Sequence, residues 1–150
     1  MRYAAKLGNL YPSDPVEALK ADSIYEFCGD LHSIYPLLMY HDCSAENWAT
    51  MKTTYLESLP RKLQGAEHLL GSHDFYGGNA PVYGDYPFFS VCDNIEILAP
   101  GTMDAYPKLK AWMGRMAQQP AVIEHYKARP KPGDKNFGRD GSYFKQHMKA

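Results

Sequence analysis

Apolar side chains recur at spacings of three and four residues along most of the chain, which is the period of an amphipathic helix. The first long run follows Pro15, a residue favoured in the first turn of a helix, with Ser13 and Asp14 as candidate caps. Its apolar positions are Ile24, Phe27, Cys28, Leu31, Ile34, Tyr35 and Leu38. Pro36 lies inside this run and predicts a kink there.

The same period continues through the middle of the chain. Ser44 is a candidate cap for a second long helix, and Pro60 is expected to bend it. The apolar positions of that helix are Trp48, Met51, Tyr55, Leu59, Leu63, Ala66 and Leu70. After a turn-rich loop, residues 86–98 lack a broad polar face, which predicts the central buried helix.

Two shorter helices complete the pattern. One is marked by Leu109, Trp112, Met113 and Met116, and Pro120 can start the last. No segment alternates apolar and polar residues as a half-buried strand does. The pattern therefore predicts an all-α fold with at least five helices and no sheet.

Both ends of the chain differ from this helical body. The first residues, MRYAAKLGNLYPSDP, have the pattern of a helix that ends at Gly8 and Asn9 and continues into a connector. The tail from Pro130 is basic, with Lys131, Lys135, Arg139, Lys145 and Lys149 against Asp134 and Asp140. We therefore expect three parts: residues 1–14, a helical domain over residues 15–129, and a basic tail over residues 130–150.

Composition narrows the classes of function. A chain of 150 residues is one domain by the usual size range, and its net charge of -1 argues against a nucleic-acid partner. Cys28, Cys43 and Cys92 are unclustered, which favours reduced thiols in the cytoplasm or another reducing compartment. No metal spacing, signal peptide or apolar run of about 20 residues is visible. We expect no metal, no membrane span and no visible targeting segment.

Two features of the sequence suggest chemistry only weakly. The sequence HDC at residues 41–43 lacks the elbow that presents a nucleophile, so we assign no catalytic residue. Asp22, Glu26 and Asp30 follow one another at one helical turn and share a face. An acidic stripe of this kind suits a subunit interface or a weak cation site, and equally an ordinary solvated helix face.

Five blocks in this order resemble the all-helical C-terminal domain of cytosolic glutathione transferases, over roughly residues 1–130. RYAAKLGNLYPSD resembles the end of the preceding thioredoxin-like domain and its linker, and PVEALKADSIYEFCGDL resembles the first helix of the helical domain. YLESLPRKLQGAEHLL resembles the second long helix with its proline. DFYGGNAPVYGDYPFF and AYPKLKAWMGRMAQQPAVIEHY resemble the loop with the buried helix start and the closing helices.

The resemblance implies the helical acceptor-site domain of a glutathione-conjugating enzyme. In this family the thioredoxin-like half binds glutathione and activates its thiol, and we expect this chain to lack that half, with residues 1–14 as its remnant. We therefore expect no cofactor, glutathione as cosubstrate only when that half is supplied, and weak or absent glutathione binding otherwise. The alternative is a non-catalytic interaction or scaffold subunit.

The resemblance also implies partners and site residues. We expect a homodimer or a protein partner to cover an exposed face near Tyr3, Tyr35 and Leu37, with Tyr3 as a packing residue at the domain junction. Asp30 corresponds to an aspartate that reaches across the dimer to the amino group of the partner's glutathione. His32, Tyr35, Pro36 and Leu37 correspond to positions that can line the acceptor pocket, the alternative being core packing for Tyr35 and Leu37 and a solvated imidazole for His32.

Asp85 matches the buried aspartate of the family's capping box, which joins a loop to the buried helix. This sequence departs from the pattern because Val82, which has no side-chain oxygen, occupies the capping position. We expect Asp85 to be structural rather than catalytic.

Overall fold

The computed structural model describes residues 1–33, residue 38 and residues 44–128. Within this part of the chain the elements are helical, and an isolated bridge between Phe75 and Gly78 is the nearest approach to a strand. The all-α prediction is confirmed. The elements are α1 (Arg2–Leu7), α2 (Pro15–His32), α4 (Ala45–Leu70), α5 (Asp85–Leu98), the short 3-10 helix η1 (Thr102–Ala105), α6 (Pro107–Met116) and α7 (Pro120–Ala128).

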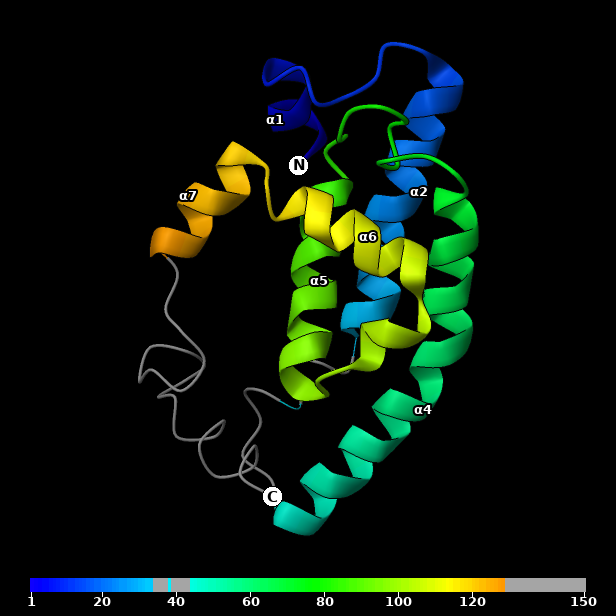
Figure 1. Ribbon diagram of the computed structural model, residues 1–150, viewed down its shortest axis with the longest axis vertical. Coiled ribbons are helices and arrows are strands. Elements are labelled where there is room, and N and C mark those ends of the chain that lie inside the picture. Colours follow the sequence, from blue (N-terminus) through cyan, green and yellow to red (C-terminus); the bar gives the residue numbers. More distant parts are fainter. Residues whose placement is uncertain (34–37, 39–43, 129–150) are drawn as a thin grey trace.

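The fold is arranged around α5 (Figure 1). Helix α5 packs against α2 and α6, and α6 crosses to α4, while α1 and α7 lie together at one end of the molecule. The inward side chains of α5 are buried, including Phe88, Cys92 and Ile95, and the ring of Trp112 on α6 lies 5.0 Å from that of Phe88, tilted by 35°. The predicted central buried helix is therefore α5.

Side-chain hydrogen bonds cap the starts of α2 and α4 at the residues that the sequence predicts. Asp14 accepts hydrogen bonds from the backbone nitrogens of Val16 (2.9 Å) and Glu17 (3.0 Å) at the start of α2. Ser44 accepts one from Asn47 at 3.3 Å at the start of α4. These bonds satisfy donors that have no intrahelical partner, which fixes both starts locally.

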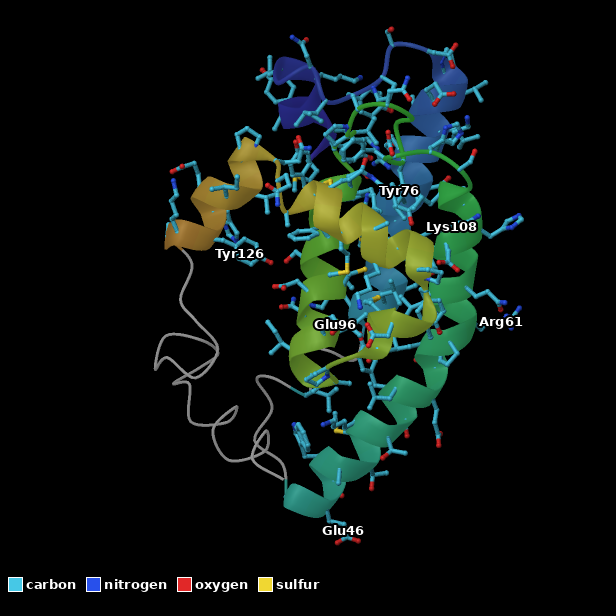
Figure 2. All side chains as sticks on the ribbon, viewed as in Figure 1. Glu46, Arg61, Tyr76, Glu96, Lys108 and Tyr126 are labelled. Carbon is cyan, nitrogen blue, oxygen red and sulfur yellow. The ribbon has the colours of Figure 1, made fainter. Side chains whose placement is uncertain are left out.

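Two other helices are capped from a distance. The first residues of η1 and α6 have no capping side chain of their own. Glu96 of α5, labelled in Figure 2, accepts from the backbone nitrogens of Gly101 (2.9 Å) and Met103 (2.6 Å). Glu67 of α4 accepts from the nitrogen of Lys108 at 2.8 Å. Carboxylates on α5 and α4 thus set where the closing helices begin.

Helix α4 contains Pro60 and changes direction between its teal and green parts in Figure 1. Proline lacks a backbone N–H and cannot donate to the carbonyl four residues earlier, so a bend is the expected result. Beyond the bend, α4 packs along α6, and the carbonyl of Pro60 accepts from the hydroxyl of Tyr106 at 3.4 Å.

Two of the buried tyrosines in the core differ in whether their hydroxyl has a hydrogen-bond partner. Tyr76 donates its hydroxyl to the carbonyl of Ala66 at 2.9 Å, whereas the hydroxyl of Tyr55, which is 1% exposed, has no hydrogen-bond partner in the described part of the chain. An unmade buried hydrogen bond costs free energy, and a made one contributes about 1 kcal/mol.

We therefore expect Tyr55→Phe to raise the free energy of unfolding by about 1 kcal/mol and Tyr76→Phe to lower it by about 1 kcal/mol. Urea unfolding of the two variants beside the parent protein measures both changes. Equal losses in the two variants would contradict the different placement of the two hydroxyls.

Candidate functional site

Asp85, the first residue of α5, is a fully buried carboxylate with three donors. Its Oδ1 accepts from Trp112 Nε1 at 2.8 Å and from the nitrogen of Tyr76 at 3.1 Å, and its Oδ2 accepts from the nitrogen of Val82 at 2.8 Å. Burial raises the pKa of Asp85, and the three hydrogen bonds oppose that rise. The geometry is that of a connector between α5, α6 and the preceding loop.

Asp22 is a second connecting carboxylate, on α2. It accepts hydrogen bonds from Arg2 Nε at 3.0 Å, from the hydroxyl of Tyr11 at 3.3 Å and from the hydroxyl of Tyr83. Arg2 also pairs with Glu26 at 2.9 Å. The hydrogen bond from Tyr83 is the main cause that lowers the pKa of Asp22, and Arg2 adds to it.

The loop before α5 packs closely against α2 beside the hydrogen bonds of Asp22. The nitrogen of Tyr83 donates to the carbonyl of Leu10 at 3.0 Å. A Cβ atom on Gly84 would lie 2.4 Å from Ile24 Cγ2 and 2.7 Å from the carbonyl oxygen of Ala21, so only glycine allows this approach. Segments that are 60 residues apart in the sequence therefore meet on one side of α2.

This network corrects one interpretation of the acidic stripe. Asp22 and Glu26 are both occupied by Arg2, so they do not form an open cation site. Sequence reasoning missed the network because Arg2, Tyr11 and Tyr83 lie on three separate segments and no spacing links them. The arginine near the start of the chain was the only local signal, and it does not indicate which acid it pairs with.

A cavity of about 390 Å³ opens between α2 and α5. Its walls are formed by Tyr25, Glu26, Cys28, Gly29, His32, Pro87, Ser90 and Val91. A mostly apolar wall with a few polar groups suits a small apolar molecule. The structure thus places His32 at a cavity, while Tyr35, Pro36 and Leu37 lie outside the described residues.

The imidazole and the thiol in the wall of this cavity are neutral near pH 7. Burial lowers the pKa of His32 and raises that of Cys28 to about 12, and the Cys28 thiol donates to the carbonyl of Ile24 at 3.2 Å. A protonated thiol is a poor nucleophile. The cavity can therefore hold a molecule without the wall itself attacking it.

Asp30 lies on the last turn of α2, outside the walls of the cavity. It is exposed, and its carboxylate forms no ion pair within residues 1–33 and 44–128. Its backbone carbonyl accepts from Lys62 Nζ at 2.8 Å. The structure therefore leaves the Asp30 side chain available to a cation from another molecule.

The end of the molecule that carries α1 and α7 exposes apolar side chains. Met1 is 70% exposed and Tyr3 is 77% exposed, so Tyr3 packs against little within the described chain. A cavity of about 350 Å³ lies beside them, with walls from Met1, Tyr86, Pro87, Phe89, Ser90, Ala121, Val122, His125 and Tyr126. Figure 2 shows Tyr126 on the side of α7 toward α5, where its ring lies 6.0 Å from that of Phe89. An apolar surface of this kind is typical of a contact with another protein unit.

A metal site and a membrane-spanning helix are both absent from the described ranges. No group of three or more histidine, cysteine or acidic side chains in them could hold a metal ion. None of the described helices is both long enough and apolar enough to cross a membrane.

Comparison with known proteins identifies relatives over most of the chain. The family model described as glutathione S-transferase, C-terminal domain, matches residues 29–129. The chain is 32% identical over 126 residues to human glutathione S-transferase P, covering 81% of this chain and 58% of that protein. It is 27% identical over 128 residues to mouse glutathione S-transferase Mu 2, covering 85% of this chain and 57% of the relative. The chain thus spans less than two thirds of the length of these relatives.

Solved structures agree with the sequence relatives. The Pi-class glutathione S-transferase of Onchocerca volvulus superposes with a TM-score of 0.74 at 30% identity, over 85% of this chain and 62% of that one. A structure described as rat hPGDS complexed with a quinoline superposes with a TM-score of 0.76 over 87% of this chain and 65% of that one. At 20% identity, the second match shows the fold alone.

The bonds around Asp85 predict opposite effects of two substitutions. We expect Val82→Thr to raise the free energy of unfolding by about 1 kcal/mol, because the new hydroxyl supplies the missing cap at the start of α5. We expect Asp85→Ala to lower it by at least about 2 kcal/mol, because three buried donors lose their acceptor. Urea unfolding measures both.

A matched control for the first substitution is Val91→Thr, at a buried position inside α5 where the hydroxyl caps nothing. This variant should lose stability. A gain at residue 91 equal to that at residue 82 would contradict the capping explanation.

Asp22 predicts a dependence of stability on acid. Because its pKa is lowered in the folded protein, its contribution is present above the unfolded pKa of about 3.9 and is lost as pH falls through the folded value. We expect the free energy of unfolding to fall less steeply below about pH 5 in Asp22→Asn than in the parent. Urea unfolding at a series of pH values tests this, with Ser23→Ala, an exposed neighbouring position on α2 without a titratable side chain, as the control that keeps the parent slope.

Proposed function

Because the chain belongs to the glutathione S-transferase family through its C-terminal helical domain, we propose that it supplies the acceptor-binding half of a glutathione-conjugating site. The observation that carries this proposal is the cavity between α2 and α5, most of whose lining residues lie in the region that the family model matches. Its size and apolar walls suit a small apolar electrophile. We propose His32, Tyr35, Pro36 and Leu37 as residues that contact that acceptor.

The protonation state of Cys28 supports a site in which this domain binds the acceptor and another domain supplies the activated thiol. Conjugation joins an electrophilic carbon to a thiolate sulfur, and the Cys28 thiol remains protonated with a pKa of about 12. The proposal therefore takes the attacking sulfur from glutathione rather than from Cys28. We propose that a thioredoxin-like domain binds glutathione and lowers the pKa of its thiol, as in the rest of the family.

Asp30 is proposed to bind the ammonium group of glutathione across a homodimer. A carboxylate and an ammonium group form a charge-assisted hydrogen bond, which is stronger than a neutral one. Support comes from the charges on α2: Arg2 occupies Asp22 and Glu26, and Asp30 alone of the three keeps an unpaired carboxylate within the described chain.

The apolar end of the molecule is proposed to contact the thioredoxin-like domain. Met1 and Tyr3 of this surface are largely exposed, and the relatives are longer proteins than this chain. In this proposal residues 1–14 form the junction, and burial of the exposed side chains stabilises the contact between the two domains.

The same apolar surface supports a second candidate function, a non-catalytic subunit that binds another protein. Either function suits a reducing compartment such as the cytoplasm, because Cys28 and Cys92 are free thiols. The two functions differ in what happens when a thioredoxin-like domain is supplied.

We expect this 150-residue chain by itself to bind glutathione more weakly than 1 mM. A millimolar dissociation constant requires about 4 kcal/mol, whereas an exposed ion pair such as that offered by Asp30 contributes roughly 0–1 kcal/mol. Calorimetry with glutathione measures this directly. Micromolar binding that disappears in Asp30→Ala would show that the chain has a complete glutathione site of its own.

The companion experiment joins the chain to the thioredoxin-like domain of a family transferase and measures conjugation. Activity in the joined protein supports the enzymatic function, and Asp30→Asn should then raise KM for glutathione about threefold or more. Glu17→Gln, in the first turn of the same helix and outside the walls of the cavity, is the matched control and should leave KM nearly unchanged. A joined protein that folds, binds glutathione and does not conjugate favours the scaffold function.

A further inference from the structure

The C-terminal end of α2 is held by a side chain from another helix. The last carbonyls of any helix lack intrahelical donors, and α2 ends at His32. The carbonyl oxygen of Asp30 accepts from Ser33 Oγ at 3.1 Å and from Lys62 Nζ at 2.8 Å. Ser33 is a local partner, whereas Lys62 comes from α4. A cation at this end also opposes the partial negative charge of the helix dipole.

Helix α4 presents two neighbouring cations in different ways. Lys62 is half-buried between the core positions Leu59 and Leu63 and reaches α2. Arg61 is exposed, and Figure 2 shows it extending away from the helices. The two residues have the same formal charge on the same helix, so the contact with α2, rather than the charge alone, distinguishes Lys62.

The middle of α2 and its last turn are fixed by different contacts. Midway along the helix, Asp22 receives hydrogen bonds from three other segments and Gly84 packs against Ile24. Toward its end, Lys62 supplies a contact with α4 at the main chain of the last turn. Since that turn carries both Asp30 and His32, its position determines where the proposed cation-binding carboxylate and one wall of the cavity lie.

We propose that Lys62 is a positioning residue, which fixes the last turn of α2 and thereby the placement of Asp30 and His32. This inference rests on the proposed function for its consequence, although the contact itself is independent of it. Lys62 bonds to the backbone carbonyl of Asp30, not to its carboxylate. The lysine therefore holds the turn while the Asp30 side chain stays available to the ammonium group of a ligand.

Three variants of the full 150-residue chain separate this role from general stability. Lys62→Met removes the donor and the charge and keeps a side chain of similar length. Lys62→Arg keeps both and should restore most of the contact. Arg61→Met removes the same charge from the exposed neighbouring position. Amide hydrogen exchange, followed by NMR, reports on residues 30–33 and on the remainder of α2 separately.

We expect Lys62→Met to speed exchange at residues 30–33 by about threefold or more, while residues 18–26 of α2 stay within the parent range. Lys62→Arg and Arg61→Met should both resemble the parent. Unchanged exchange at residues 30–33 would overturn the proposal, and so would an equal rise along all of α2, because that is the signature of a general loss of stability.

A second readout tests the consequence at the cavity. Nitrobenzene, a small apolar aromatic probe, is titrated while the imidazole signals of His32 are followed by NMR. We expect the probe to shift these signals in the parent and to bind about threefold more weakly to Lys62→Met, with Arg61→Met unchanged. Faster local exchange with unchanged probe affinity would overturn the positioning role. If the parent signals do not move, the proposed acceptor cavity fails instead, and the exchange result still decides whether Lys62 fixes the turn.

Discussion

A single buried carboxylate joins the start of the central helix to the loop before it and to α6. Asp85 accepts from the indole nitrogen of Trp112 on α6 and from two backbone nitrogens of the preceding loop. Because the carboxylate is inaccessible to water, each of these donors depends on it for its hydrogen bond. The position of α5 against α6, and with it the wall of the cavity formed by Pro87, Ser90 and Val91, depends on this connection.

Contacts with two cationic side chains, Arg2 and Lys62, determine which carboxylates of α2 are paired and where its last turn lies. Arg2 pairs with Asp22 and Glu26 midway along the helix, and Lys62 donates a hydrogen bond to the main chain of its last turn. A single exposed ion pair contributes little to the free energy of unfolding. The main effect of these contacts is therefore to position the side chains and the last turn of α2. The result is one available carboxylate, Asp30, close to a cavity whose histidine and thiol are neutral. This combination suits a site that receives its nucleophile from elsewhere.

Much of the fold followed from local patterns. Asp14 and Ser44 cap the helices that their positions predicted, and Pro60 lies where α4 bends. The strongly apolar segment 86–98 became the central helix, and the order of sequence blocks identified the family that the comparisons show. The candidate site was less accessible to prediction. The structure places His32 in the wall of a cavity, and its contact with an acceptor stays a prediction. The hydrogen bonds of Asp22 and the contact of Lys62 with α2 were not foreseen, because their partners lie on separate segments.

By itself the sequence determined which residues form helices and where several of them begin. These features depend on neighbours within a few residues, whose spacing is fixed by the geometry of the helix. Only the tertiary structure decided which charges pair, which hydroxyl of two similar tyrosines has a partner, and which of the adjacent cations Arg61 and Lys62 reaches another helix. Such choices depend on distances of a few ångströms between segments that are remote in the chain, and no local spacing specifies them.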